Sequence, residues 1–137
     1  MIKITNIDLN SVNLFLKEAK LSGQVSRFRT RLIKKIDAKV YEIGEEERSI
    51  IVDNGAEVKD NGQISGNGSK ETFEKISKEL TELRQERSIF EEDTEGQFYK
   101  LYAELCNYSE LIAGEAADGY DKLMDSFEEG GYNEPHT

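Results

Sequence analysis

Hydrophobic residues recur every three or four positions over most of the chain, which is the spacing of one face of an α-helix. The clearest stripe follows steps of three and four residues through Val25, Phe28, Leu32, Ile36, Val40 and Ile43. Ile36, Ile43 and Ile50 also repeat every seven residues, as in a coiled coil. The pattern predicts one long helix from about 24 to 52, roughly 45 Å at 1.5 Å per residue.

A second amphipathic stripe indicates the partner of this helix. Phe73, Ile76, Leu80 and Leu83 follow one another in steps of three, four and three. We expect this helix to pair antiparallel with the long one, with Leu32, Ile36 and Leu80 filling the seam between them. No proline interrupts either helix, because Pro135 is the only proline in the chain.

The remaining segments are short. Residues 2–4 alternate as in a strand, and Asn61-Gly62 predicts a β-hairpin near 58–65, because this dipeptide favours tight hairpin turns. Short helices are predicted over 12–19, over 94–108 and from Gly114 to Phe127, with a short strand at Ile89-Phe90. The predicted fold is mainly α: a long antiparallel helical hairpin plus short C-terminal helices, with small β elements.

Length and composition fit one domain. A chain of 137 residues with 36% hydrophobic and 34% charged residues favours a single helical domain over residues 1–130, followed by a flexible tail at 131–137. Cys106 is the only cysteine, so no intramolecular disulfide can form. No signal-peptide pattern and no apolar run near eighteen residues is present, so we expect a cytoplasmic protein with no membrane partner.

Charge is strongly polarised along the chain. Residues 1–40 carry nine Lys and Arg against three Asp and Glu, and residues 41–137 carry nine against twenty-five, so that +6 and −16 sum to the net −10. At 100° per residue, Arg27, Arg31 and Lys34 fall within about 60° of one another, and Lys35 adjoins them. These four residues form the candidate partner-binding face.

Two interpretations of this basic face stay open. It can complement acidic residues of the third and last helices within the same fold, or it can dock an acidic protein or phosphates. We expect intramolecular pairing for Arg31, next to the apolar stripe, and partner contact for Lys34 and Lys35. Nucleic acid is disfavoured, because the acidic remainder repels a polyanion and no aromatic stacking array accompanies the arginines.

No segment indicates an enzyme, a cofactor or a metal. The run 60–71 has the terminal acids of a calcium-binding EF-hand loop, but Gly62 and Ile64 stand where oxygen ligands are needed. His136 is the only histidine, which removes the usual zinc sets and histidine-activated nucleophiles. Acidic clusters at 91–93 and 128–129 fit solvated charge. We therefore expect no catalytic residue, no cofactor-binding residue and no metal ligand.

Several segments resemble a family of uncharacterised proteins, a domain of unknown function, encoded by phages and prophages of Gram-positive bacteria. The N-terminal Ile-Lys-Ile strand precedes residues 26–34, which look like that family's Ser-Arg-x-Arg-Thr-Arg-Phe-Ile-Lys pattern. A Glu-rich helix at 45–48 follows, and Gly114-Glu115-Ala116-Ala117 with Tyr120-Asp121 resembles its closing motifs. The family has no assigned reaction, so the resemblance implies phage origin and no catalytic residue.

Together these observations predict a non-enzymatic, phage-encoded protein that binds another protein. One role is to bind a host factor and inhibit or redirect it, as anti-defence or host-takeover proteins do, with the acidic surface imitating nucleic acid. The other is a late-gene component of virion or tail assembly. The partner's identity and the oligomeric state stay open, and a homodimer is compatible with the sequence.

Overall fold

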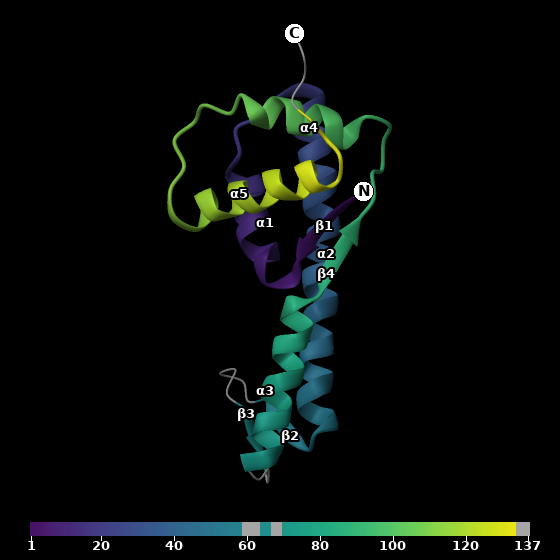
Figure 1. Ribbon diagram of the computed structural model, residues 1–137, viewed down its shortest axis with the longest axis vertical. Coiled ribbons are helices and arrows are strands. Elements are labelled where there is room, and N and C mark those ends of the chain that lie inside the picture. The colour runs from purple at the N-terminus through teal and green to yellow at the C-terminus, as the bar shows by residue number, and fades with distance from the viewer. Residues whose placement is uncertain (59–63, 67–69, 134–137) are drawn as a thin grey trace.

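The computed structural model describes residues 1–58, 64–66 and 70–133, and this part of the chain is mainly helical (Figure 1). The helical segments are the 3-10 turn η1 (Asn6–Asp8), α1 (Leu9–Glu18), α2 (Gly23–Asp53), α3 (Lys70–Gln85), α4 (Gln97–Cys106) and α5 (Gly114–Glu129). The strands are β1 (Ile2–Thr5), β2 (Ala56–Val58), β3 (Ile64–Gly66) and β4 (Arg87–Phe90). The predicted mainly α fold is confirmed, and the long helix extends one residue beyond its predicted range at each end.

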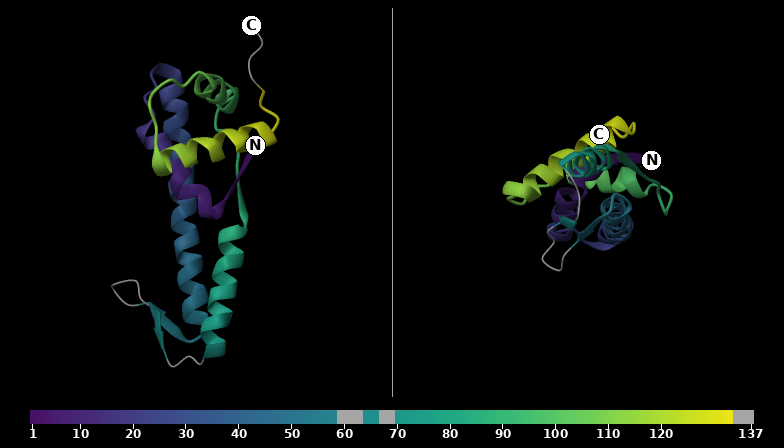
Figure 2. Two further views of the ribbon diagram at one scale, coloured as in Figure 1. Left: turned by 60° about the vertical axis from the view of Figure 1, so that its left-hand side comes forward. Right: turned by 90° about the horizontal axis from the view of Figure 1, so that it is seen from below.

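The molecule consists of a head and a stalk (Figures 1 and 2). The head contains β1, α1, the N-terminal half of α2, β4, α4 and α5. The stalk contains the C-terminal half of α2, which lies beside α3, and the small sheet of β2 and β3. Helix α2 is therefore the one element that runs through both parts.

The main hydrophobic core fills the head, with α1 packed between α5 and α2. Phe15 of α1 meets Tyr108 and Tyr120 edge to face, at ring-centroid distances of 5.5 and 5.1 Å. Such aromatic pairs add stabilisation beyond the area that they bury. Other fully buried side chains come from every helix of the head: Leu16, Leu32, Ile36, Phe98, Leu101, Leu105, Leu123 and Phe127.

Gly119 permits the closest approach between α5 and α1. A Cβ atom at this position would lie 1.9 Å from the carbonyl oxygen of Ser11, well inside van der Waals contact. Only glycine fits there without moving a backbone, so this residue sets how closely the two helices pack.

A two-stranded sheet connects the start of the chain to the segment that follows α3. β1 pairs antiparallel with β4, with Ile2 opposite Phe90 and Ile4 opposite Ser88. Ile2, Ile4 and Phe90 are buried in the head core. The Nδ2 atom of Asn6 donates to the carbonyl oxygen of Leu83 at 2.9 Å, which fixes the end of α3 against the head.

The stalk is an antiparallel helix pair with the small sheet of β2 and β3 at its end. Arg84 Nη2 lies 3.6 Å from Glu47 Oε2, and Asn54 Nδ2 donates to Glu79 Oε2 at 2.9 Å. A small apolar cluster of Ile51, Ala56, Ile76 and Leu80 lies near the end of the stalk. β2 pairs antiparallel with β3, as predicted, and Asn61-Gly62 lies outside the described residues.

One expectation about packing is wrong. Leu32 and Ile36 belong to the head core and contact neither Leu80 nor its cluster, because α3 accompanies only the C-terminal half of α2. Tyr132, in the segment predicted to be a flexible tail, packs its ring 5.9 Å from that of Phe127. Residues 134–137 of that segment lie outside the described part of the chain.

None of the described helices is both long and apolar enough to span a membrane.

Candidate interaction surface on the long helix

The basic segment at 26–35 lies where α2 passes through the head. The structure divides the side chains of this basic run into two groups. Phe28, Leu32 and Ile36 are buried in the head or at its edge, so they define the inner face of α2. Side chains on the flanks reach the loop between β4 and α4. Those on the opposite, outer face point away from the head, because successive residues turn by 100° around the helix axis.

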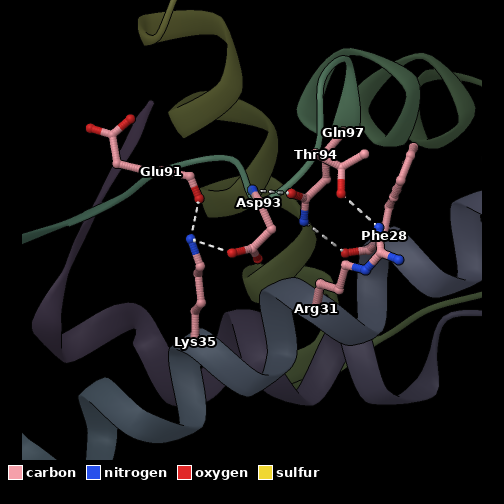
Figure 3. A network of polar contacts seen from close by, with 7 residues as sticks. All are labelled: Phe28, Arg31, Lys35, Glu91, Asp93, Thr94 and Gln97. Atoms are coloured by element: carbon pink, nitrogen blue, oxygen red, sulfur yellow. Dashed lines mark hydrogen bonds and ion pairs between the residues drawn. The ribbon is translucent and has the colours of Figure 1, made fainter.

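Arg31 is half-buried against the head and is bound within the protein. Its Nη1 atom donates to Thr94 Oγ1 at 2.7 Å, and its guanidinium carbon lies 5.7 Å from the centre of the Phe28 ring (Figure 3). A guanidinium in this position gains a cation–π attraction as well as a hydrogen bond. Arg31 therefore bonds within the protein, but its partner is a hydroxyl before α4 and not a carboxylate of the third or last helix.

Lys35 also bonds to residues of its own chain, whereas partner contact was expected for it. Its ammonium donates to the carbonyl oxygen of Glu91 at 2.6 Å and lies 3.1 Å from Asp93 Oδ1 (Figure 3). Both acceptors lie in the loop after β4, which no sequence periodicity placed beside α2. Lys35 therefore attaches this loop to the long helix.

Gln97 completes the attachment of the loop. It is fully buried at the start of α4, where its Nε2 atom donates to the carbonyl oxygen of Phe28 at 3.2 Å and its Oε1 atom accepts from the Asp93 amide at 2.7 Å (Figure 3). A buried amide with both ends bonded fixes local geometry, because leaving either end unpaired is costly. Sequence reasoning missed Gln97, and no pattern around it indicated a buried polar residue.

Arg29 of the same run faces the end of α1. Its Nη1 atom donates to the carbonyl oxygen of Ala19, and its Nη2 atom donates to Ser26 Oγ at 3.0 Å. Three of the five cations in this run thus stabilise the head.

Arg27 and Lys34 form the second group. Both side chains are exposed, and neither makes a hydrogen bond or an ion pair with any residue that the structure describes. They are seven residues apart, so they lie within about 20° of each other on the outer face of α2 and about 10.5 Å apart along its axis. Of the four predicted partner-binding residues, these two remain available to another molecule.

Two further residues continue this row. Tyr41 and Arg48 follow Lys34 at intervals of seven residues, are exposed, and make no hydrogen bond or ion pair within the described parts of the chain. Tyr41 is 72% exposed. We call Arg27, Lys34, Tyr41 and Arg48 the outer stripe. Sequence reasoning ended the basic face at Lys35, although the seven-residue spacing to Tyr41 was visible in the sequence.

The acidic clusters have structural partners. Glu92 Oε1 accepts from the amide of Phe98 at 2.7 Å near the start of α4, where carboxylates favour a helix N-terminus. Glu128 accepts from the Tyr102 hydroxyl at 3.1 Å, and Glu129 pairs with Arg87. We expected the carboxylates of both clusters to be solvated, but some of them bond to other residues of the protein.

Metal-binding residues do not gather in the described part of the chain. Within residues 1–58, 64–66 and 70–133, no group of three or more His, Cys, Asp or Glu side chains could hold an ion. His136 and most of the segment that resembles an EF-hand loop lie outside these ranges.

Comparison of the chain with protein-family models, with curated proteins and with solved structures finds no match.

Proposed function

We propose that this protein is a non-enzymatic, phage-encoded binding protein that attaches to a host factor in the infected bacterial cytoplasm and inhibits or redirects it. The phage assignment rests on the resemblance of residues 26–34 and 114–121 to the phage and prophage family. The binding role rests on the outer stripe. The protein needs no catalytic group for this role, because covering another protein's surface is enough to block it.

The observation that carries the proposal is that Arg27 and Lys34 have no hydrogen-bond or ion-pair partner among the described residues, in a chain with a net charge of −10. Their neighbours Arg31 and Lys35 both bond to the loop before α4. Stability of this fold therefore does not require the two exposed cations. An acidic surface on another protein is the partner that their charge fits best.

A protein partner fits better than nucleic acid. The stalk carries an open acidic groove between α2 and α3, lined by Glu45, Glu46, Asp53, Glu79, Glu82 and Glu86. This groove runs along the stalk, from Asp53 and Glu79 to Glu86 beside the head, and repels a polyanion that extends along α2. A folded protein with a local acidic patch can contact the head end of the stripe and avoid the groove.

A role in virion or tail assembly is the second candidate, and the elongated head-and-stalk shape favours it (Figures 1 and 2). Gene neighbourhood separates the two roles. Adjacent tail and lysis genes favour assembly, whereas an early or accessory cluster favours action on a host factor.

Affinity capture of the tagged full-length chain from phage-infected cells tests the proposal. We expect one protein to be enriched with the wild type and lost with Arg27→Gln/Lys34→Gln, because the double variant removes the two exposed cations at the head end of the outer stripe. Lys75→Gln/Lys78→Gln is the matched control, since these exposed lysines of α3 lie off the stripe and removing them changes the net charge equally.

The captured protein must also respond to binding. Adding the purified wild type to the isolated host factor should lower or alter its activity, and the double variant should do so only at much higher concentration. Equal capture by the wild type and the double variant would exclude the outer stripe as the binding surface. Capture of virion components alone would favour the assembly role.

A further inference from the structure

The spacing and chemistry of the outer stripe restrict what can bind to it. Arg27, Lys34 and Tyr41 are seven residues apart, so they succeed one another about every 10.5 Å along α2 and drift by only about 20° per step. All three are exposed and point to the side opposite Leu32 and Ile36. These three residues of the outer stripe therefore form a nearly straight row of two cations and one aromatic ring.

We propose that an acidic α-helix of the partner lies along this row. In this arrangement two carboxylates seven residues apart face Arg27 and Lys34, and an apolar residue one heptad further covers the ring of Tyr41. The inference rests on the proposed function and adds to it the secondary structure and the charge spacing of the segment that binds.

The distance of about 10.5 Å between successive stripe residues favours a helical partner segment over an extended one. A helix presents side chains on one face at seven-residue intervals of about 10.5 Å, the interval between Arg27 and Lys34. A strand rises about 3.3 Å per residue and alternates its faces, so its nearest matching positions on one face lie about 6.6 or 13 Å apart. Exposed Ala38, between Lys34 and Tyr41, adds little bulk and leaves room for a helix at ordinary packing distance.

The residue types of the outer stripe also favour binding at this surface. Arginine and tyrosine are enriched among residues that dominate binding energy, particularly where they meet a partner in a desolvated contact. Tyr41 is among the most exposed large side chains of the described protein, at 72%. A helix that covers Tyr41 removes this ring from water while its carboxylates bind the cations.

A second copy of the same chain fits the stripe less well. Pairing the outer face of α2 with itself brings Arg27 and Lys34 against cations of the other copy, and like charges repel. The acidic remainder of the protein disfavours nucleic acid on this face. Charge complementarity therefore disfavours stripe-to-stripe pairing of two copies and favours an acidic helix of a different protein.

Two synthetic helical peptides of equal composition, each about 21 residues long, test the spacing. One peptide places glutamates at positions i and i+7 and a leucine at i+14, and the other distributes the same residues around the helix. Fluorescence anisotropy measures the affinity of each for the full-length protein. We expect the matched peptide to bind about tenfold more tightly, and raising the salt concentration to weaken it.

Variants identify the contacts. Arg27→Gln/Lys34→Gln and Tyr41→Ala should each weaken the matched peptide about tenfold. Lys75→Gln/Lys78→Gln and Tyr99→Ala should leave it unchanged, because Lys75, Lys78 and Tyr99 are exposed residues elsewhere on the surface.

Equal affinity for the two peptides would overturn the acidic-helix inference. If capture from infected cells still depends on Arg27 and Lys34, the proposed function stands and only this inference falls. If capture does not depend on them, the proposed function fails, irrespective of the affinities measured for the two peptides. Sedimentation that shows a wild-type dimer lost in the double variant would replace the acidic helix with a second copy of the chain.

Discussion

The ammonium of Lys35 lies 3.1 Å from the carboxylate of Asp93, and this contact attaches the loop after β4 to the long helix α2. The adjacent residue, Lys34, is exposed and makes no hydrogen bond or ion pair within the described residues. Two consecutive lysines thus have different environments, because a turn of 100° moves the side chain from the flank of the helix to its outer face.

This difference predicts different effects on stability. Lys35→Gln should lower the free energy of unfolding by about 1 kcal/mol, since it removes a partly buried ion pair and a hydrogen bond to Glu91. Lys34→Gln should leave the urea denaturation midpoint unchanged. Equal losses in the two variants would mean that Lys34 also binds within the fold.

Two glycines in helices should respond in opposite directions to the same substitution. Gly119→Ala should destabilise the protein by about 3 kcal/mol or more, because the added Cβ would lie 1.9 Å from the Ser11 carbonyl oxygen and force α5 away from α1. Gly44→Ala in α2 should stabilise it by about 0.5–1 kcal/mol, since nothing lies within 4 Å of the added methyl group. Thermal melts of both variants measure this. A Gly119→Ala protein as stable as the wild type would contradict the close helix contact.

Alanine substitutions should distinguish the contribution of the head core to stability from that of the stalk. Leu32→Ala and Ile36→Ala should each cost about 2–5 kcal/mol, because both side chains are fully buried in the head core. Leu80→Ala should cost about 2 kcal/mol, at the low end of this range, because its cluster is small and the side chain is 7% exposed.

Hydrogen exchange locates each loss. Leu80→Ala should increase amide exchange in α3 more than in α1, and Leu32→Ala should increase it in α1, α2 and α4 together. Equal increases throughout the chain for Leu80→Ala would show that the stalk and the head unfold as one unit.

Tyr102 should make stability depend on pH at the alkaline end. Burial raises the pKa of its hydroxyl above the usual 10.0, and Cys106 and Glu128 raise it further. Above about pH 10 the unfolded chain loses a proton that the folded protein keeps, so the free energy of unfolding falls as the pH rises. Below this pH the contribution is fully present.

The variant Tyr102→Phe isolates this group. It should cost about 1 kcal/mol at neutral pH through loss of the hydrogen bond to Glu128, and its stability should fall less steeply than that of the wild type above pH 10. Urea denaturation at a series of pH values measures both slopes. Parallel slopes would mean that Tyr102 titrates alike in the folded and unfolded states.

The elements were largely predictable from the sequence, because hydrophobic spacing and the absence of internal proline specify helices locally. The partners of those elements were not. Ile2 pairs opposite Phe90, and Leu32 packs in the head and not against Leu80, since such contacts depend on where α3 ends and how the chain returns.

The candidate site was likewise predictable in its position along the chain but not in its contacts. Its position on α2 was predictable from the charge run, but the separation of Lys35 from Lys34 depended on a loop without periodicity. Gln97 could not be identified as a buried polar residue, because its role requires the carbonyl oxygen of Phe28 and the amide of Asp93.

Photo-crosslinking in infected cells would show whether the outer face of α2 binds a partner protein. Benzoylphenylalanine at position 38, between Lys34 and Tyr41, should give a covalent adduct with one protein. The yield should fall sharply when Arg27 and Lys34 are replaced by glutamine. The same probe at position 75 on α3 should give little adduct with that protein. No adduct from position 38, or an equal yield from position 75, would contradict binding through the outer stripe.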